Sequence, residues 1–249
     1  MRIYIFILFL ILAFSGKATE KDSLIAQIFN LAYNQKYEAA ELLLHANKAN
    51  IDTLHFAVME IDMSYWKNIT GNHNPDYKAF EKTLSLFEIE SPETFNQEGI
   101  QLIQLSYKLR YELKRFKLLD AIFTHNKTNT LFKQLKSDSE MQNVNDPELF
   151  QLYNSMFLYF SNYLKPLGGK AKIQNCNQAL LELKVLSKSS NLVTKTIACY
   201  SLGKTYLTYE NAPKKGLLHF KALAKLYPEN RRFPELITEC EEELNKEDS

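Results

Sequence analysis

The sequence predicts an all-helical protein, and two features lead to this prediction. Glycine and proline, which weaken or interrupt helices, occur only seven times each in 249 residues, whereas leucine, lysine, glutamate, glutamine and alanine are abundant. Apolar residues recur at steps of three and four along most of the chain, which places them on one face of a helix. A helix with one apolar face needs a neighbour to cover it, so we expect helices packed in pairs.

The first 18 residues match the pattern of a secretory signal peptide. Arg2 supplies a positive start, residues 3–14 form an unbroken apolar run of twelve, and small residues allow cleavage after Ser15 or Ala18. A run of twelve is shorter than the roughly 18–20 apolar residues of a membrane-spanning helix, which favours cleavage over an uncleaved anchor. No cysteine follows the run to carry a lipid anchor. We therefore expect an exported protein, periplasmic or secreted, without membrane insertion after cleavage.

The mature chain would carry almost no net charge. Lysine plus arginine total 30 against 29 acids, and removal of residues 1–18 takes away Arg2 and Lys17, which leaves 28 against 29 and a formal charge of −1. This balance gives no general attraction to nucleic acid or to an anionic membrane. The remaining 231 residues suffice for one sizeable core or one continuous repeat array.

Four helices are predicted in the first part of the mature chain. Asp52 is a suitable N-cap for the third, because its carboxylate can accept hydrogen bonds from the free N–H groups of the first turn. Gly71 ends that helix, and the next starts near Pro75. The expected ranges are residues 22–34, 37–48, 52–69 and 75–88.

Two further helices are predicted between residues 91 and 136. Ser91, Pro92 and Glu93 form a helix start that combines a hydroxyl cap, a proline at the first position and an acid in the first turn. We place the break between the two helices near residues 114–117, although no glycine or proline stands there. The polar, acid-bearing stretch at residues 138–146 is expected to be a linker or exposed loop.

The C-terminal part is predicted to hold five helices. The first of them, residues 147–164, has two apolar stripes, so it should be packed between neighbours. Residues 173–187 form its partner, and a pair of helices follows within residues 196–230. Residues 234–243 form a last, acidic helix with the character of a solvent-exposed cap.

The helix pair within residues 196–230 carries the most informative pattern in the chain. Gly203 is followed three residues later by Tyr206, and Gly216 stands four residues before Phe220 and twelve before Pro228. The two glycines allow two helices to approach backbone to backbone, with the aromatic rings beside the contact. Pro228 lacks an N–H and stops the second helix.

This pattern resembles the tetratricopeptide repeat, a family built from stacked helix hairpins. Residues 196–230 match its pattern well, residues 22–48 match it in part, and the other pairs match in architecture alone. The resemblance implies an α-solenoid of about five antiparallel hairpins with a terminal cap, grouped as residues 19–137 and 147–249. Irregular helix lengths leave a compact all-helical domain open as an alternative.

The resemblance also implies a binding groove, because in that family the first helix of each repeat lines the concave surface. Carried onto the best-matching pair, the groove-facing positions are Ile197, Tyr200, Lys204, Leu207 and Thr208.

Tyr65 and Trp66 form an aromatic pair on another first helix, where they could anchor a peptide. Buried packing is the alternative, since both rings bury large apolar areas in any stack of helices. Tyr206 is expected to be structural.

No set of residues points to catalysis, a cofactor or a metal. The five histidines lack metal-ligand spacing, and neither a nucleophile motif nor a phosphate-binding glycine loop is present. Cys176, Cys199 and Cys240 are expected to pack in helix interfaces, although a disulfide between the first two stays open.

The basic run at residues 107–117 has aromatic residues between its cations, a composition that nucleic-acid strips share. However, Leu105, Leu109, Leu113 and Phe116 trace a helical core stripe, which leaves the basic residues on a solvated face. We therefore expect no nucleic-acid partner.

The sequence thus predicts a non-catalytic scaffold or adaptor that binds a protein or peptide through a concave helical surface. Two alternatives remain. One is a structural subunit of an exported assembly, including a homo-oligomer, and the other is a receptor for a small molecule or glycan near Trp66.

Overall fold

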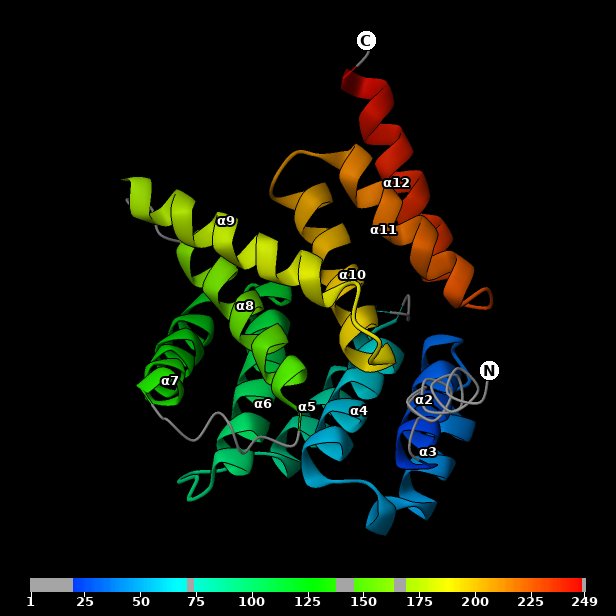
Figure 1. The fold of residues 1–249 in the computed structure, drawn as a ribbon, viewed down its shortest axis with the longest axis vertical. Coiled ribbons are helices and arrows are strands. Elements are labelled where there is room, and N and C mark those ends of the chain that lie inside the picture. The colour runs from blue at the N-terminus through cyan, green and yellow to red at the C-terminus, as the bar shows by residue number, and fades with distance from the viewer. Residues whose placement is uncertain (1–19, 71–73, 138–145, 164–168, 248–249) are drawn as a thin grey trace, which may run out of the picture.

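The structure confirms the all-helical fold class for the residues that it describes. The computed structural model describes residues 20–70, 74–137, 146–163 and 169–247, and these contain helices and no strand. The predicted signal segment, residues 1–18, lies outside this range, as do residues 138–145 of the predicted linker. The elements in order are α2 (Glu20–Tyr33), α3 (Tyr37–Ala46), η1 (Lys48–Asn50), α4 (Thr53–Tyr65), η2 (Trp66–Thr70), α5 (Tyr77–Leu86), α6 (Phe95–Lys114), α7 (Leu118–Ser137), α8 (Pro147–Tyr163), α9 (Gly169–Leu186), α10 (Leu192–Thr208), α11 (Pro213–Leu226) and α12 (Arg232–Glu247) (Figure 1).

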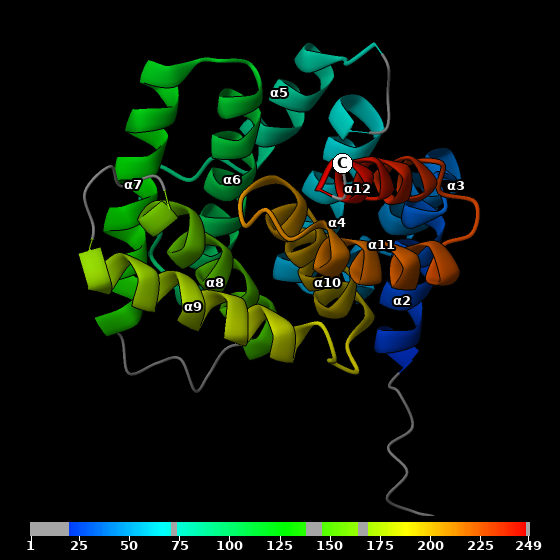
Figure 2. The same cartoon turned by 90° about the horizontal axis from the view of Figure 1, so that it is seen from above.

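Successive helices pack in pairs, as the sequence predicts. α2 packs on α3, α4 on α5, α6 on α7, α8 on α9 and α10 on α11, and α12 covers α11. The first helix of most pairs is the more deeply buried one: α4, α6, α8 and α10 bury residues on almost every side, whereas α3, α5 and α9 bury one narrow stripe. The inner helices therefore form the core, and their partners cover it (Figure 2).

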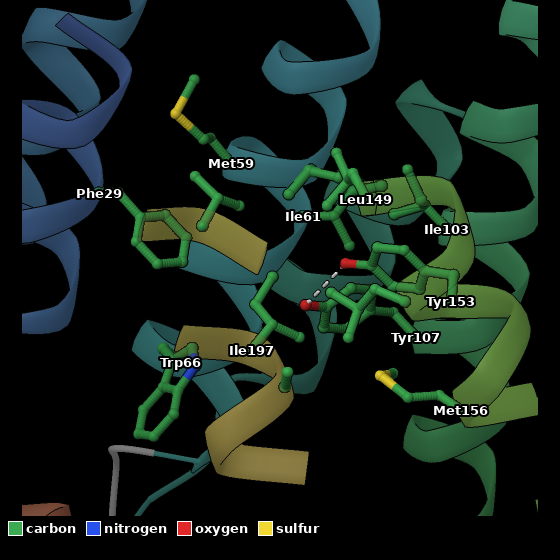
Figure 3. Close-up of a cluster of buried hydrophobic side chains, with 14 of the residues drawn as sticks. Phe29, Met59, Ile61, Trp66, Ile103, Tyr107, Leu149, Tyr153, Met156 and Ile197 are labelled. Atoms are coloured by element: carbon green, nitrogen blue, oxygen red, sulfur yellow. Dashed lines mark hydrogen bonds between the residues drawn. The ribbon is translucent and has the colours of Figure 1, made fainter. Parts of the chain in front are cut away.

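The inner helices close into a ring. Each of α2, α4, α6 and α8 contacts the next inner helix, and α10 returns to contact α2. Figure 3 shows the result, a single cluster of apolar side chains contributed by several of these helices. The end of α2 is joined directly to the turn between α11 and α12, since the Asn230 side chain donates to the Tyr33 carbonyl at 2.6 Å and Lys36 pairs with Glu229 at 2.6 Å. An open superhelix would hold its first and last hairpins apart.

The close approach predicted for α10 and α11 is confirmed. A Cβ atom added to Gly216 would lie 3.0 Å from the Gly203 carbonyl oxygen, and one added to Gly203 would lie 2.6 Å from the Phe220 ring. Phe220 and Tyr206 are both buried beside this contact. Glycine is needed at both positions because any side chain would separate the two helices.

Two predicted helix boundaries behave differently. Asp52 caps α4 as expected, with its Oδ1 accepting from the His55 N–H at 3.0 Å. The helix start predicted at Ser91 is wrong, because α6 begins at Phe95. Its cap is Thr94, whose Oγ1 accepts from the Gln97 N–H at 3.3 Å, and the Gln97 side chain accepts in return from the Glu93 N–H. These two bonds fix the start of the helix at Thr94, three residues after Ser91.

The predicted break near residues 114–117 is confirmed, and its cause is visible. Phe116 adopts a left-handed backbone with φ 57°, and the Lys117 N–H donates to the Glu112 carbonyl at 2.9 Å, which is a Schellman ending. This geometry turns Phe116 away from the core stripe to which the sequence assigned it, and the side chain is 86% exposed. The assignment of Phe116 to the core is therefore wrong.

Candidate functional site

The aromatic pair predicted at the end of α4 is split between the core and a half-buried position. Trp66 is only 3% exposed, and its indole N–H donates to the Tyr33 hydroxyl at 3.1 Å. The rings of Tyr200 and Phe233 pack on it with centroids at 4.9 and 5.7 Å. Trp66 therefore joins α2, α10 and α12, which favours the packing alternative, while Tyr65 is half-buried.

The five positions predicted on α10 also divide by exposure. Ile197 is buried and belongs to the core, whereas Tyr200, Lys204 and Leu207 are half-buried and Thr208 is exposed. Lys204 lies 4.0 Å from Glu239 of α12. The half-buried and exposed residues stay a predicted binding surface, with α12 beside Lys204.

Cations gather around this part of α10. Burial, together with the nearby charges of Arg232 and Lys204, lowers the pKa of Lys114, so the three side chains share one region. Lys114 donates to the Ile69 carbonyl at 3.0 Å, and Arg232 pairs with Glu235 and Glu239 at 2.7 and 2.8 Å. Two acids of the same chain therefore neutralise the charge of Arg232. This pairing limits the positive charge that the region could offer to a ligand.

A buried charged cluster joins the starts of α4 and α8. The His55 ring lies between the carboxylates of Asp52, at 2.8 Å, and Asp146, at 3.1 Å. Asp146 also caps α8 through the Leu149 N–H at 2.9 Å and accepts from Asn191. Although burial alone would lower it, the two carboxylates raise the pKa of His55 to about 9. Every oxygen described here has a structural partner, so the cluster acts as a clamp between helices.

The most exposed apolar surface of the described residues lies on α7 and the turn before it. We call this surface the α7 face. It consists of Phe116 (86% exposed), Leu118 (60%), Leu119 (73%), Ile122 (56%) and Phe123 (72%). Figures 1 and 2 place α7 at one edge of the molecule, packed on α6.

The exposure of the α7 face follows from the opposite side of the same helix. Ala121, Thr124, Thr128, Leu131 and Leu135 recur at steps of three and four and are buried. These residues settle which side of α7 faces the protein. The apolar doublets at 118–119 and 122–123 point away from that side and remain uncovered by any described element.

A cleft of about 390 Å³ borders the α7 face, between α5, α6 and α7. α5 packs on α4 and α7 on α6, which leaves room between the two outer helices. Phe123 belongs both to the α7 face and to the wall of the cleft, so the two surfaces are continuous. The lining side chains are Glu81, Leu84, Ser85, Glu88, Gln104, Lys108, Tyr111, Glu112, Lys117, Asp120, Phe123 and Thr124.

The acidic residue Glu112 of α6 lines this cleft, and its side chain is buried with one carboxylate oxygen unpaired in the ranges that the structure describes. It is only 5% exposed, and none of the described residues donates a hydrogen bond to its Oε2. Burial raises the pKa of its carboxyl group, with a partly opposing hydrogen bond from Thr124. A buried carboxylate oxygen without a donor is costly, by about 1–3 kcal/mol or more.

Sequence reasoning missed the α7 face and the cleft. The available signal was the pair of apolar doublets four residues apart, Leu118–Leu119 and Ile122–Phe123, combined with small or hydroxylated residues on the other side of the helix. Apolar doublets in a helix usually belong to the core. They indicate an exposed surface here only because the structure shows that the other side of α7 is the packed one.

The same residues show the state of the cysteines, of possible metal ligands and of possible membrane spans. All three cysteines are free, so the disulfide left open between Cys176 and Cys199 is not formed. No three His, Cys, Asp or Glu side chains in the described ranges converge in a way that could hold a metal ion. Among the helices that the structure describes, every one is too short or too polar to serve as a transmembrane span.

Comparison with known proteins finds no protein-family model, no curated protein and no solved structure that matches this chain. The tetratricopeptide resemblance therefore stays a prediction based on the pattern of residues 196–230.

Proposed function

We propose that this protein is a non-catalytic scaffold that binds a partner protein through the α7 face. The observation that carries the proposal is the group of five large apolar side chains, each more than half exposed, within the eight residues 116–123 at the start of one edge helix. Contiguous apolar surfaces of this kind mark interaction sites in soluble proteins. Burying them against a partner would remove their apolar area from water.

The proposal keeps the functional class predicted from sequence and changes the main surface. The concave side of a repeat array was the expected groove, yet the inner helices here close on one another and bury Trp66 and Ile197. Tyr65 and the α10 residues Tyr200, Lys204, Leu207 and Thr208 stay candidates for a second binding surface. We also propose that the helix hairpins form a tetratricopeptide-like array, which the contact between α10 and α2 closes.

Export is the proposed location, supported by the pattern of residues 1–18. Mass spectrometry of the intact protein isolated from its native cells tests this location. A mass that lacks residues 1–15 or 1–18 supports export with cleavage, and a mass that retains the apolar run contradicts cleavage.

Site-specific photo-crosslinking in native cells tests the binding proposal. A photoreactive amino acid replaces Leu119 on the α7 face, and the matched control replaces Leu42 of α3, which is 75% exposed and isolated from that face. We expect a discrete adduct with a different protein from position 119 and none from position 42. The same diffuse products from both positions would contradict the proposal.

The structural-subunit alternative has its own outcome in this experiment. An adduct from position 119 that contains only this chain, together with a stable oligomer by light scattering, would show that the α7 face joins copies of the protein. That result would replace the scaffold proposal.

A further inference from the structure

We propose that the cleft between α5, α6 and α7 receives a basic side chain, arginine or lysine, from the protein that covers the α7 face. The inference rests on the proposed function and names the chemistry of the partner. Three observations support it: the charge of the cleft, the state of Glu112, and the aromatic walls that connect the cleft with the α7 face.

The cleft carries an excess of negative charge. Four acids line it, Glu81, Glu88, Glu112 and Asp120, against the two bases Lys108 and Lys117. Glu81 is already occupied, because it accepts from the Tyr111 hydroxyl and lies 3.3 and 3.4 Å from Arg115 and Lys117.

The other acids of the cleft do not share the short cation contacts that hold Glu81. In the described part of the chain no ion pair within 4.0 Å involves Glu88, Glu112 or Asp120. Lys108 is the one lining base that Glu81 does not hold. A cation would therefore find complementary charge in the cleft.

Glu112 gives the cleft an unfilled acceptor. Its side chain is more than nine-tenths buried, it lines the cleft, and its Oε2 has no donor among the described residues. A guanidinium or ammonium group carries several N–H donors and no acceptor, so it can satisfy carboxylates on more than one wall at once. Bound there, the cation would also oppose the effect of burial on the Glu112 carboxyl group.

The walls suit a cation with an apolar stem. Tyr111 and Phe123 supply aromatic rings, and the chain's own Lys117 already lies over the Tyr111 ring at 5.6 Å. Attraction between a cation and a ring face adds to the charge complementarity. The methylene groups of a lysine or arginine would contact Leu84 and Phe123 on the way to the acids.

Continuity with the α7 face favours a protein over a free small cation. A small cation would fill the cleft and leave Phe116, Leu118, Leu119 and Ile122 exposed to water. A polypeptide can place a basic side chain in the cleft and apolar side chains on the α7 face at the same time. The basic residue would fix the register of the partner, and the apolar residues would supply area.

Selection from a displayed library of random short peptides tests this inference on the purified protein. We expect enriched peptides that carry arginine or lysine next to apolar residues. Replacing that basic residue by glutamine should weaken binding about tenfold or more. Glu112→Gln combined with Asp120→Asn should cause a similar loss and should not add to the peptide change, because both remove the same interaction.

Matched controls separate the cleft from general charge and from folding. Glu90→Gln changes an exposed acid two residues from Glu88 and outside the cleft, and it should leave the affinity unchanged. Glu112→Gln removes a buried carboxylate and keeps a side-chain oxygen that can accept from Thr124, so the variant should fold, as circular dichroism would show.

The outcomes distinguish the inference from the proposed function. Peptides that require Leu119 and Phe123 but ignore the cleft acids overturn the basic-side-chain inference and leave the scaffold proposal intact. Failure to enrich any peptide that depends on the α7 face, together with no adduct at position 119, overturns both. Agmatine or spermidine binding alone as tightly as the peptides would make the cleft a small-cation site and overturn the inference.

Discussion

The stability of this fold should depend on the charge of His55. The ring of His55 lies between Asp52 and Asp146, which cap α4 and α8, so its positive charge holds the starts of two inner helices together. The two carboxylates raise its pKa from 6.5 to about 9 in spite of burial. Because the folded protein binds the proton more tightly than the unfolded chain, His55 stabilises the fold below about pH 6.5, and this stabilisation disappears as the pH rises through 9.

The size of the effect follows from the difference between the two pKa values. Each pKa unit corresponds to about 1.4 kcal/mol, so a rise from 6.5 to about 9 contributes about 3 kcal/mol at most. His55→Gln keeps a polar side chain that does not titrate. The free energy of unfolding of the wild-type protein should therefore exceed that of the variant by about 3 kcal/mol more at pH 6.5 than at pH 10.

Urea unfolding measures this difference directly. Trp66 is the only tryptophan and is buried, so its emission reports the transition, and circular dichroism provides a second probe. Titration of tyrosines, lysines and thiols changes both proteins and cancels in the comparison. A gap between wild type and variant that stays the same from pH 6.5 to pH 10 would refute a charged His55 between the two carboxylates.

Three further predictions concern packing, backbone and redox state. Gly203→Ala should lower the free energy of unfolding by about 1–3 kcal/mol, because the new Cβ would press on the Phe220 ring; an unchanged urea midpoint would contradict the close helix contact. Phe116→Gly should raise stability by about 1 kcal/mol at the left-handed position and weaken the adduct at position 119, and a loss of stability would count against the Schellman ending. Reductant should leave Tm unchanged because the three cysteines are free, and a drop would reveal a disulfide.

The parts of the fold that could be predicted from sequence depend on local chemistry. Asp52 was recognised as a cap because a short acidic side chain can bond the first N–H groups of any helix. Gly203 and Gly216 marked a close helix contact because only glycine permits it. The start of α6 was misplaced because Ser91 and Thr94 both suit a cap, and the Gln97 side chain decides between them.

The candidate site could not be predicted in the same way. Leu118, Leu119, Ile122 and Phe123 have the apolar character of core residues, and nothing local distinguishes an apolar face that meets a neighbour from one that does not. Trp66 shows the converse case: its aromatic ring suits a binding anchor, but the ring is buried. Its burial depends on Tyr33, which is distant in the sequence. Glu112 carries no signal in the sequence, since its unpaired oxygen results from the packing of α7 on α6.

The sequence by itself determined that this chain forms paired helices, where most of them begin and end, and that α10 and α11 touch at two glycines. These properties are set within a few residues by hydrogen-bond capping, helical periodicity and steric room. Only the tertiary structure decided that α10 returns to α2, that Trp66 is enclosed, and that the α7 face and its acidic cleft are left open. Those properties depend on which faces of distant helices meet, and apolar side chains attract one another without regard to their order along the chain.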